Sequence, residues 1–468
     1  MLSPVILAGM VRLAEFLLTL ASGLAIAMLY HGDTAVAGDE LYDATFLLAS
    51  LGVIAALDLL GLYRPQALGS VHRNLPRLML GWGTGFALVI AAAFFLKAGH
   101  ELSRAWLALW FVVGGVLLIG WRAGVGILVQ RLTRSGRLLR RAVVYGTGPI
   151  ADDLVRKLEA DTSAQIRIVG VFDDRADARA TDAAGRYPRL GTLDEMLNVS
   201  RVLRVDLVIV ALPLAGEQRL IDVASRISEL PADVRLPAQA TSIRLARRLY
   251  SHVGEVAMID LHDRPIADWG HVAKWVFDKT IGLSALVLLA PVMALVALAI
   301  KLDSRGPVLF RQKRYGFNNE LIEVLKFRSM HTALSDANAD RLVTRSDPRV
   351  TRVGRFIRRT SLDELPQLFN VLTGELSLVG PRPHALAAKA EDQLYNEVVA
   401  RYFARHKVKP GITGWAQISG WRGETDTREK IEKRVEHDLY YIENWSVFFD
   451  IYILAATPFA LLKSENAY

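Results

Sequence analysis

Cysteine is absent from this 468-residue chain. Disulfides, thiolate nucleophiles and Cys-ligated zinc or iron-sulfur centres are therefore excluded, and the chemistry must use oxygen and nitrogen groups. Acidic residues are the minority charge, with 48 Asp and Glu against 56 Lys and Arg, which gives a net charge of +8. Such an excess suits anionic partners, namely phosphates, lipid headgroups or nucleic acid, without choosing among them.

Long apolar runs are abundant, since 52% of the residues are hydrophobic. Four such runs lie at residues 11–30, 44–62, 78–96 and 105–129. Each is close to the roughly 20 residues that a helix needs to cross a bilayer. The first is not expected to be a cleaved signal, because no A-x-A-like site follows it and three more runs do. The sequence therefore predicts a bundle of four transmembrane helices.

Charge in the connections predicts the orientation of this bundle. The connection after the first run has four acidic residues between 33 and 43 and no Lys or Arg, whereas the one after the second has Arg64, Arg73 and Arg77. Five arginines between Arg131 and Arg141 follow the fourth run. The positive-inside rule then places both ends of the bundle in the cytoplasm.

The segment from residue 141 to about 236 alternates short β-rich runs with helical ones. Strands are expected at 142–145, 166–172 and 207–211, and helices at 150–160 and 218–230. This order predicts βαβ units with a parallel sheet, which is a Rossmann-like domain.

The turn after the first of these strands fits a dinucleotide-binding pattern. Gly146 to Ala151 reads G-x-G-x-x-A, and Asp173 and Asp174 end the next strand, where a ribose-binding acid would lie. The pattern alone is weak evidence. Nucleotide binding at this turn is therefore one hypothesis, and a domain that binds no nucleotide is the other.

A fifth apolar run at 280–300 differs from the others. It has Pro291 at its middle and basic residues on both flanks. Because proline kinks a helix and symmetric positive flanks favour neither crossing direction, we expect a re-entrant element at 272–301 with its break at Pro291. A straight fifth span is the alternative. A later apolar stretch at 447–462 is interrupted by Asp450 and Pro458, which favours an interfacial helix.

The expected fold therefore has three parts. Residues 1–135 form a four-helix transmembrane domain, residues 136–262 a Rossmann-like α/β domain, and residues 263–468 a membrane-associated α/β catalytic domain with the re-entrant helix.

The densest candidate site is the stretch from Arg358 to Gln367. Pro366 suits the first turn of a helix, so the adjacent carboxylates Asp363 and Glu364 lie at or just before a helix start. One carboxylate could attack phosphorus while the other holds Mg²⁺. The alternative is a capping box between Ser361 and Glu364, which requires no catalysis.

Basic sequence surrounds this pair. Seven arginines fall between Arg341 and Arg359, Lys326 and Arg328 end a strand-like run, and Arg382 stands between Pro381 and Pro383. Prolines on both sides fix the backbone of that arginine, and a fixed guanidinium is well matched to phosphate oxygens. Together these elements outline an anion site around the carboxylates.

Four motifs in order resemble the bacterial polyprenyl-phosphate hexose 1-phosphate transferases. They are residues 326–330, 361–367, 380–383 and the later VKPGITGWAQ at 408–417. The whole chain also resembles the large form of this family, and most closely the undecaprenyl-phosphate glucose phosphotransferases that initiate exopolysaccharide repeat units.

The resemblance implies a role for each matching residue. Asp363 would be the nucleophile that forms a covalent phosphosugar intermediate with release of UMP, and Glu364 would help bind Mg²⁺. The implied phosphate- and substrate-binding residues are Lys326, Arg328, Arg358, Pro381, Arg382, Pro383, Trp415 and Gln417. Trp415 could stack on uracil or sit at the membrane interface.

The resemblance also implies a location in a bacterial inner membrane, with the catalytic domain facing the cytoplasm, and a set of partners. These partners are a UDP-sugar, undecaprenyl phosphate and membrane lipids, with no nucleic acid, and the middle domain offers a surface for a homodimer. It further implies a regulatory or assembly role for that middle domain. UDP-glucose is the expected donor and UDP-galactose the alternative.

Two rival functions are weighed against this one. A membrane-anchored nucleotide-sugar dehydratase needs a Tyr-x-x-x-Lys pair, and no tyrosine here has a lysine four positions later. A non-enzymatic scaffold for polysaccharide assembly would leave the carboxylate and Pro-Arg-Pro motifs unexplained.

Overall fold

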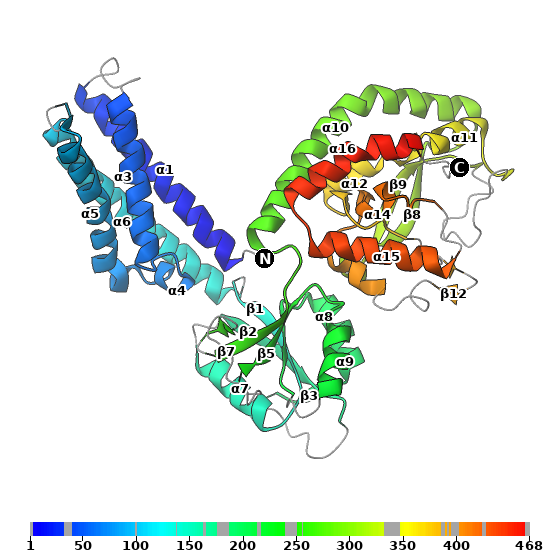
Figure 1. The fold of residues 1–468 in the computed structure, drawn as a ribbon, viewed down its shortest axis with the longest axis horizontal. Helices are drawn as coiled ribbons and strands as arrows, with labels where there is room; N and C mark the ends of the chain where they lie inside the picture. Colours follow the sequence, from blue (N-terminus) through cyan, green and yellow to red (C-terminus); the bar gives the residue numbers. More distant parts are fainter. Residues whose placement is uncertain are drawn as a thin grey trace. The chain divides into compact units, whose positions relative to one another are not determined.

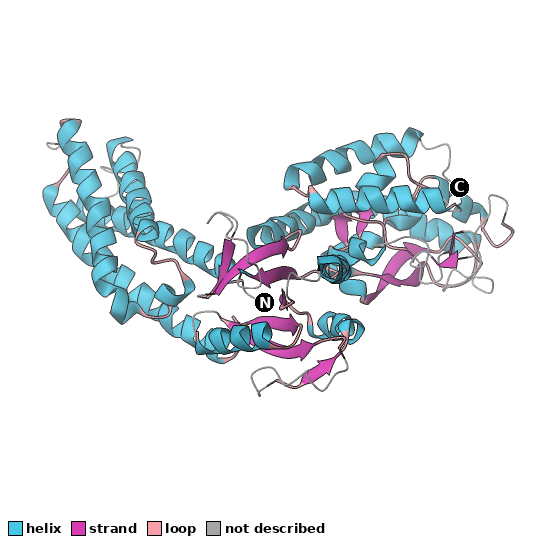
Figure 2. Ribbon diagram, turned by 60° about the horizontal axis from the view of Figure 1, so that its bottom comes forward, coloured by secondary structure: helices cyan, strands magenta, loops and turns pink. Residues whose placement is uncertain are grey.

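The computed structural model divides the chain into two compact units, residues 1–139 and residues 140–468. Figure 1 shows the elements of each unit along the chain, and Figure 2 distinguishes helices from strands. The structure describes residues 3–31, 40–98, 101–136, 138–161, 165–175, 187–212, 217–238, 250–254, 256–331, 347–384, 389–390, 393–394, 402–423 and 427–463.

The first unit is a helical bundle. Its helices are α1 (Pro4–His31), α3 (Glu40–Leu59), the short α4 (Pro65–Leu68), α5 (Val71–Phe95) and α6 (Arg104–Arg134). The four predicted apolar runs therefore lie on α1, α3, α5 and α6. Within the described ranges, these four and one later helix are long and apolar enough to cross a membrane.

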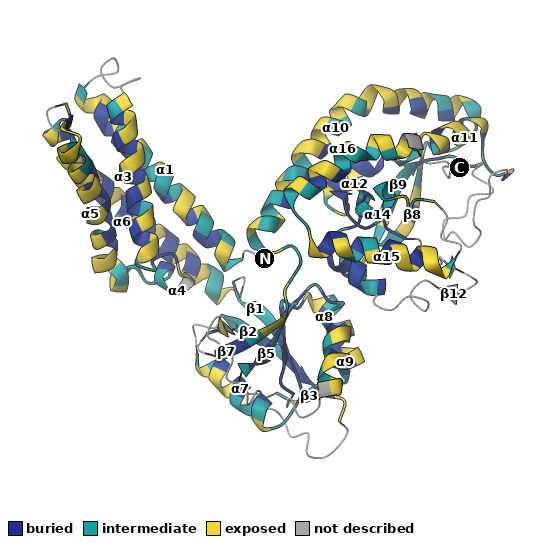
Figure 3. Cartoon of the chain, in the orientation of Figure 1, coloured by how far each residue is buried: buried dark blue, intermediate teal, exposed yellow. Residues whose placement is uncertain are grey.

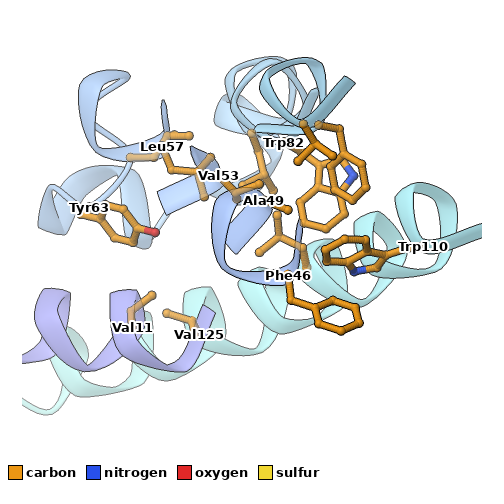
Figure 4. Packing of buried hydrophobic residues seen from close by; sticks show 14 of the residues in the cluster. Val11, Phe46, Ala49, Val53, Leu57, Tyr63, Trp82, Trp110 and Val125 are labelled. Atoms are coloured by element: carbon orange, nitrogen blue, oxygen red, sulfur yellow. The ribbon is translucent and has the colours of Figure 1, made fainter. Parts of the chain in front are cut away.

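The interior of this bundle contains large aromatic residues and glycines at close helix contacts. Phe46, Trp82 and Trp110 are buried together (Figure 4). Helices α3 and α5 approach closely at Gly85, where a Cβ would lie 2.3 Å from Val53 Cγ2 and 2.7 Å from the Val53 nitrogen. Small residues at such crossings are typical of membrane helices, because close backbone packing replaces the hydrophobic driving force.

A buried ion pair crosses the same bundle. Glu15 on α1 and Arg122 on α6 are both buried, and Tyr63 donates a 2.7 Å hydrogen bond to Glu15 Oε2. Arg122 also donates to the carbonyl of Leu62 at 2.8 Å. The pair therefore ties α1 and α6 to the connection after α3.

The second unit begins with a seven-stranded sheet of order β3-β2-β1-β4-β5-β7-β6. Its strands are β1 (Arg140–Tyr145), β2 (Ile166–Phe172), β3 (Arg189–Gly191), β4 (Leu207–Val210), β5 (Asp233–Pro237), β6 (Tyr250–Val253) and β7 (Val256–His262). The first five pair in parallel, and the last two are antiparallel. Helices α7 (Pro149–Ala160), α8 (Leu193–Leu203) and α9 (Glu217–Ile227) alternate with these strands, which is the predicted βαβ arrangement.

The rest of this unit is built around short strands and helices. It contains the hairpin of β8 (Leu309–Tyr315) and β9 (Leu321–Phe327), joined by η5 (Phe317–Asn319), and the parallel pair of β10 (Ser377–Val379) and β13 (Gly411–Thr413). Two-residue strands β11 (Lys389–Ala390) and β12 (Gln393–Leu394) pair with each other. The helices are α10 (Asp268–Asp303), α11 (Arg352–Arg359), η7 (Leu362–Glu364), α12 (Gln367–Thr373), η8 (Tyr402–Lys407), α14 (Trp415–Ile418), α15 (Arg428–Glu443) and α16 (Val447–Lys463).

Helix α10 is the longest of the described helices, at 36 residues, and it contains Pro291. Figure 1 shows that its axis changes direction along its length. Near its start, Lys274 donates to the carbonyl of Val379 at 2.9 Å. At its end, Asp303 accepts a 3.1 Å hydrogen bond from the nitrogen of Val353. Both ends of α10 are thus held by the same fold.

Much of the surface of α10 is nevertheless uncovered by protein. Leu283, Val287, Leu288 and Leu295 are all exposed, and the helix is largely yellow and teal in Figure 3. An apolar helix that the protein leaves uncovered is suited to lipid.

We predict that Gly85→Ala lowers the thermal stability of the purified protein in detergent, because the new methyl group collides with the Val53 backbone. Overpacking of this kind costs about 1–3 kcal/mol. Gly83→Ala on the same helix is the control, since a Cβ there meets nothing within 4 Å. Equal melting temperatures for the two variants would contradict the close α3–α5 contact.

Candidate active site

The two candidate carboxylates lie on a single turn between α11 and α12. Asp363 and Glu364 belong to η7, and Pro366 follows as the N-cap of α12. Ser361 precedes them in the left-handed conformation, with φ of 58°. A non-glycine residue in this region is uncommon and stores strain, so the sharp turn that aims the carboxylates is maintained by its surroundings.

Glu364 is held by two cations from distant segments. Lys326 on β9 donates to Oε1 at 2.9 Å. Arg382, which follows β10, donates to Oε2 at 3.0 Å and also to Oε1. The side chain of Glu364 is only 13% exposed. Sequence positions 326, 364 and 382 therefore meet in one partly buried ion cluster.

The two neighbouring carboxylates differ in their proton affinity. Burial, reinforced by the charge of Glu364, raises the pKa of Asp363 to about 6. Burial also acts to raise the pKa of Glu364, but Arg382 and Lys326 outweigh it and hold that pKa well below its usual value. Adjacent groups whose environments separate their pKa values are typical of catalytic pairs.

The capping-box alternative is wrong for this turn. Ser361 has no side-chain capping hydrogen bond, and its Oγ accepts a hydrogen bond from Arg422 instead. The carboxylate of Glu364 faces Lys326 and Arg382 rather than the turn backbone. Glu364 therefore belongs to a charge cluster and does not merely terminate a helix.

Three further cationic residues lie at this site. The sequence does not single out Arg314 and Arg422, whereas for Arg405 it leaves open an extension of the phosphate site or a surface that faces lipid headgroups. Burial lowers the pKa of Arg314 to about 10, with the charge of Arg382 acting in the same direction. Arg314 donates to the carbonyl of Pro383, and Arg405 donates to the carbonyl of Arg382 at 2.6 Å. Arg422 is the third. No local pattern distinguishes these arginines from others in a basic domain, because only the tertiary fold brings them here.

Arg405 fixes the Pro-Arg-Pro segment through its backbone. Its guanidinium is fully buried, pairs with Asp438 at 2.6 Å and also contacts the ring of His384. Burial and the neighbouring Arg405 keep the pKa of His384 well below its usual value. The segment is therefore held by a buried polar network as well as by its prolines, and Pro381 contributes a carbonyl that accepts from Gly411 at 3.0 Å.

Arg328 lies elsewhere than expected. Its guanidinium donates to the carbonyl of Ser304 at 2.7 Å and to that of Arg305 at 3.0 Å. Because carbonyls at the end of a helix lack intrahelical partners, a nearby arginine satisfies them. The structure thus assigns Arg328 to the end of α10 and not to the phosphate site.

The remaining predicted residues, Arg358, Trp415 and Gln417, lie in three different environments. Arg358 is half-buried at the end of α11, and its charge acts to lower the pKa of Asp363. Trp415 packs among aromatic rings of α15 and α16, with its centroid 5.3 Å from that of Phe449. Gln417 lies on α14, and its Oε1 is buried with no hydrogen-bond partner in the described structure.

The glycine turn of the α/β domain is filled by its own side chains. The carboxylate of Asp173 is fully buried and accepts from the nitrogen of Thr147 at 2.9 Å and from its Oγ1 at 2.7 Å. Asp174 accepts from the hydroxyl of Tyr145 at 2.7 Å and from the nitrogen of Leu193 at 2.7 Å. Both acids expected near a ribose are therefore engaged within the protein.

Comparison with known proteins identifies the family of the chain. Residues 269–464 match the bacterial sugar transferase family. A relative from Komagataeibacter xylinus, named undecaprenyl-phosphate glucose phosphotransferase, is 42% identical over 405 residues, which cover 86% of this chain and 71% of the relative. The chain belongs to the bacterial sugar transferase family. The resemblance and the enzyme class predicted from the motifs, a phosphoglycosyl transferase, are thereby confirmed.

Further relatives of this sugar transferase differ in how much of it they cover. A UDP-glucose:undecaprenyl-phosphate glucose-1-phosphate transferase of Xanthomonas campestris pv. campestris is 34% identical over 98% of this chain and 94% of its own length. The exopolysaccharide production protein PSS of Rhizobium leguminosarum bv. phaseoli is 50% identical over 40% of this chain and 93% of its own length. Residues 58–238 match a family described as a CoA-binding domain.

We predict that Arg382→Lys lowers kcat/KM of the sugar transferase about 10- to 100-fold. The single nitrogen of a lysine cannot make the two parallel hydrogen bonds that the guanidinium makes with Glu364, and a lost charge-assisted hydrogen bond costs about 1.5–3 kcal/mol. The matched control is Arg311→Lys, whose side chain is 73% exposed on β8. Unchanged kinetics in Arg382→Lys would show that the bidentate contact has no part in turnover.

Proposed function

We propose that this enzyme transfers glucose 1-phosphate from UDP-glucose to undecaprenyl phosphate and releases UMP. The observation that carries the proposal is the pair on η7, in which Lys326 and Arg382 hydrogen-bond to Glu364 while burial raises the pKa of the adjacent Asp363 to about 6. The Xanthomonas relative, named for a UDP-glucose donor and an undecaprenyl phosphate acceptor, supports this choice of substrates. We further propose that the reaction is the first step in assembling an exopolysaccharide repeat unit.

The chemistry proceeds in two displacements. A carboxylate oxygen of Asp363 attacks the phosphorus that bears the sugar, and the bond from that phosphorus to the bridging oxygen breaks, so UMP leaves with the bonding electrons. An oxygen of the lipid phosphate then attacks the same phosphorus. The bond to Asp363 breaks, the carboxylate is regenerated, and the sugar phosphate leaves as a diphosphate-linked lipid.

The surrounding cations suit a diphosphate substrate. Lys326 and Arg382 are positioned by Glu364, and Arg314 and Arg422 add positive charge that interacts with the same carboxylates. Fixed cations favour the charge that develops on the transferring phosphoryl group and on the leaving UMP. Asp363, with a pKa of about 6, is largely ionised at neutral pH and so can act as a nucleophile.

We also propose that Glu364 helps to hold Mg²⁺. No cluster of three or more metal-ligating residues occurs in the described part of the chain. This agrees with the usual binding of Mg²⁺ by one or two carboxylates together with substrate phosphates. A carboxylate has about four lone-pair sites, and among the described residues Oε2 of Glu364 accepts one hydrogen bond, from Arg382. When bound there, the ion would neutralise charge on the diphosphate.

The proposed membrane arrangement follows from the substrates. UDP-sugars are cytoplasmic, so the carboxylates must face the cytoplasm, where positive charge places the end of the bundle. We propose that α10 dips into the membrane and returns, with its bend at Pro291. The contacts of Lys274 and Asp303 support this, because both ends of α10 meet the same fold.

The decisive experiment is an assay of the full chain with labelled UDP-glucose or UDP-galactose, undecaprenyl phosphate and Mg²⁺. We expect UMP and labelled lipid with UDP-glucose, and loss of at least a thousandfold in Asp363→Asn, because an amide is not a nucleophile for this step. Asp194→Asn is the control, since that side chain is 71% exposed on α8.

Other outcomes of this assay would change the proposal. Product with UDP-galactose alone would replace the donor while leaving the reaction class intact. Full lipid-product formation by Asp363→Asn would remove the covalent step. UMP release at the same rate with and without Mg²⁺ would show that the reaction does not need the metal.

Activity should depend on pH through Asp363. Its raised pKa means that the ionised nucleophile is lost as pH falls through about 6, so kcat/KM should drop roughly tenfold between pH 7 and pH 5. The measurement is a pH–rate profile for UMP release, with circular dichroism at each pH to verify folding. A flat profile from pH 5 to pH 8 with intact folding would contradict this assignment.

A further inference from the structure

A second cationic cluster lies at the opposite end of α12 from the carboxylates. Lys279 on α10 and Lys409, just before β13, both approach Gly374, the C-cap of α12. A Cβ built on Gly374 would lie 3.5 Å from Lys409 Nζ and 3.7 Å from Lys279 Nζ. Both ammonium groups therefore lie less than 4 Å from the position that the Cβ atom of a side chain at residue 374 would occupy.

Among the described residues, no acidic side chain pairs with either ammonium group of this cluster. Lys279 donates to the carbonyls of Val371 and Leu372 at the end of α12. The two nearby acids, Asp278 and Asp450, both pair with Lys274, and Asp450 does so at 2.6 Å.

The positive charge of Lys409 has fewer polar contacts than that of Lys279. Its ammonium group makes no hydrogen bond or ion pair within the described ranges, although the residue is only half-exposed. Burial lowers the pKa of Lys409, and Lys279 and Lys274 act in the same direction against Asp278. An anion between Lys279 and Lys409 would relieve this repulsion.

The cluster opens onto an apolar helix face. Trp275, Lys279, Leu283 and Val287 follow one another at four-residue spacing on α10, so they share one face. Trp275, Leu283 and Val287 are 53%, 53% and 67% exposed. Tryptophan and lysine next to an uncovered apolar run are typical of the level where a helix enters the headgroup region.

The site is distinct from the one where transfer occurs. Helix α12 has seven residues, Gln367–Thr373, so about 10 Å of helix separates Gly374 from the turn that carries Asp363 and Glu364. A phosphate held at Gly374 would not be positioned for attack at Asp363.

We propose that Lys279 and Lys409 bind the headgroup phosphate of an anionic membrane phospholipid, whose acyl chains lie along Leu283 and Val287. The phosphate supplies the missing negative charge, and the chains cover the exposed face of α10. This lipid would anchor the start of α10 and the segment before β13 at one depth in the membrane.

Native mass spectrometry of the full chain in detergent tests the proposal, with phosphatidylglycerol and phosphatidylcholine as probes. The unaltered chain should retain one phosphatidylglycerol in preference to phosphatidylcholine. Lys409→Gln should weaken that retention about 10- to 100-fold, as expected for a lost charge-assisted contact, whereas Lys409→Arg should keep it. Lys301→Gln, an exposed lysine near the other end of α10, should bind as the unaltered chain does.

Three results would overturn the proposal. One is equal retention of phosphatidylglycerol by Lys409→Gln and the unaltered chain. Another is equal binding of the two phospholipids. The third is displacement of phosphatidylglycerol by equimolar undecaprenyl phosphate, which would assign the cluster to the acceptor lipid. None of these results bears on UMP release, so the transfer reaction is tested separately.

Discussion

The ion cluster around Glu364 is the interaction on which the catalytic domain depends. It joins β9 through Lys326, the turn η7 through Glu364, and the segment after β10 through Arg382. Breaking a partly buried cluster of this kind leaves an uncompensated charge, which is far more costly than the loss of a surface pair. The three segments are therefore held in one arrangement. The contacts of Glu364 fix the turn η7, and with it the position of Asp363.

The supports of this cluster extend well beyond it. The carbonyl of Arg382 is held by Arg405, which is itself paired with Asp438 on α15. The carbonyl of Val379, three residues earlier, accepts hydrogen bonds from Lys274 on α10 and from the hydroxyl of Tyr441 on α15. The segment from Val379 to Arg382, beside the two carboxylates, is thus held in part by a buried polar contact from α10, the helix that we propose enters the membrane. Binding at the membrane and geometry at the carboxylates are linked through the backbone of this one segment.

Much of the fold and part of the site could be predicted from the sequence, for separate physical reasons. Apolar runs of bilayer length predict helices because backbone groups must be satisfied internally in lipid. Pro366 predicts the helix start beside Asp363 and Glu364 because a helix tolerates proline in its first turn and not in its interior. Arg328, Arg314 and Arg422 could not be placed in this way. Each is one arginine among many, and whether it binds a helix end or the carboxylate cluster depends on segments far away in the chain. Trp415 is similar, since its aromatic neighbours come from α15 and α16.

Helix α10 has a consequence for how such a protein could be assembled in evolution. Both of its ends are held by the catalytic fold, so with the proposed entry of α10 into the membrane that fold would carry its own attachment to the bilayer. The bundle of α1 to α6 and the parallel-sheet domain would then be additions to a module that attaches itself. Such additions can be gained, exchanged or lost without disturbing the chemistry, which leaves them open to selection for when and where the enzyme works.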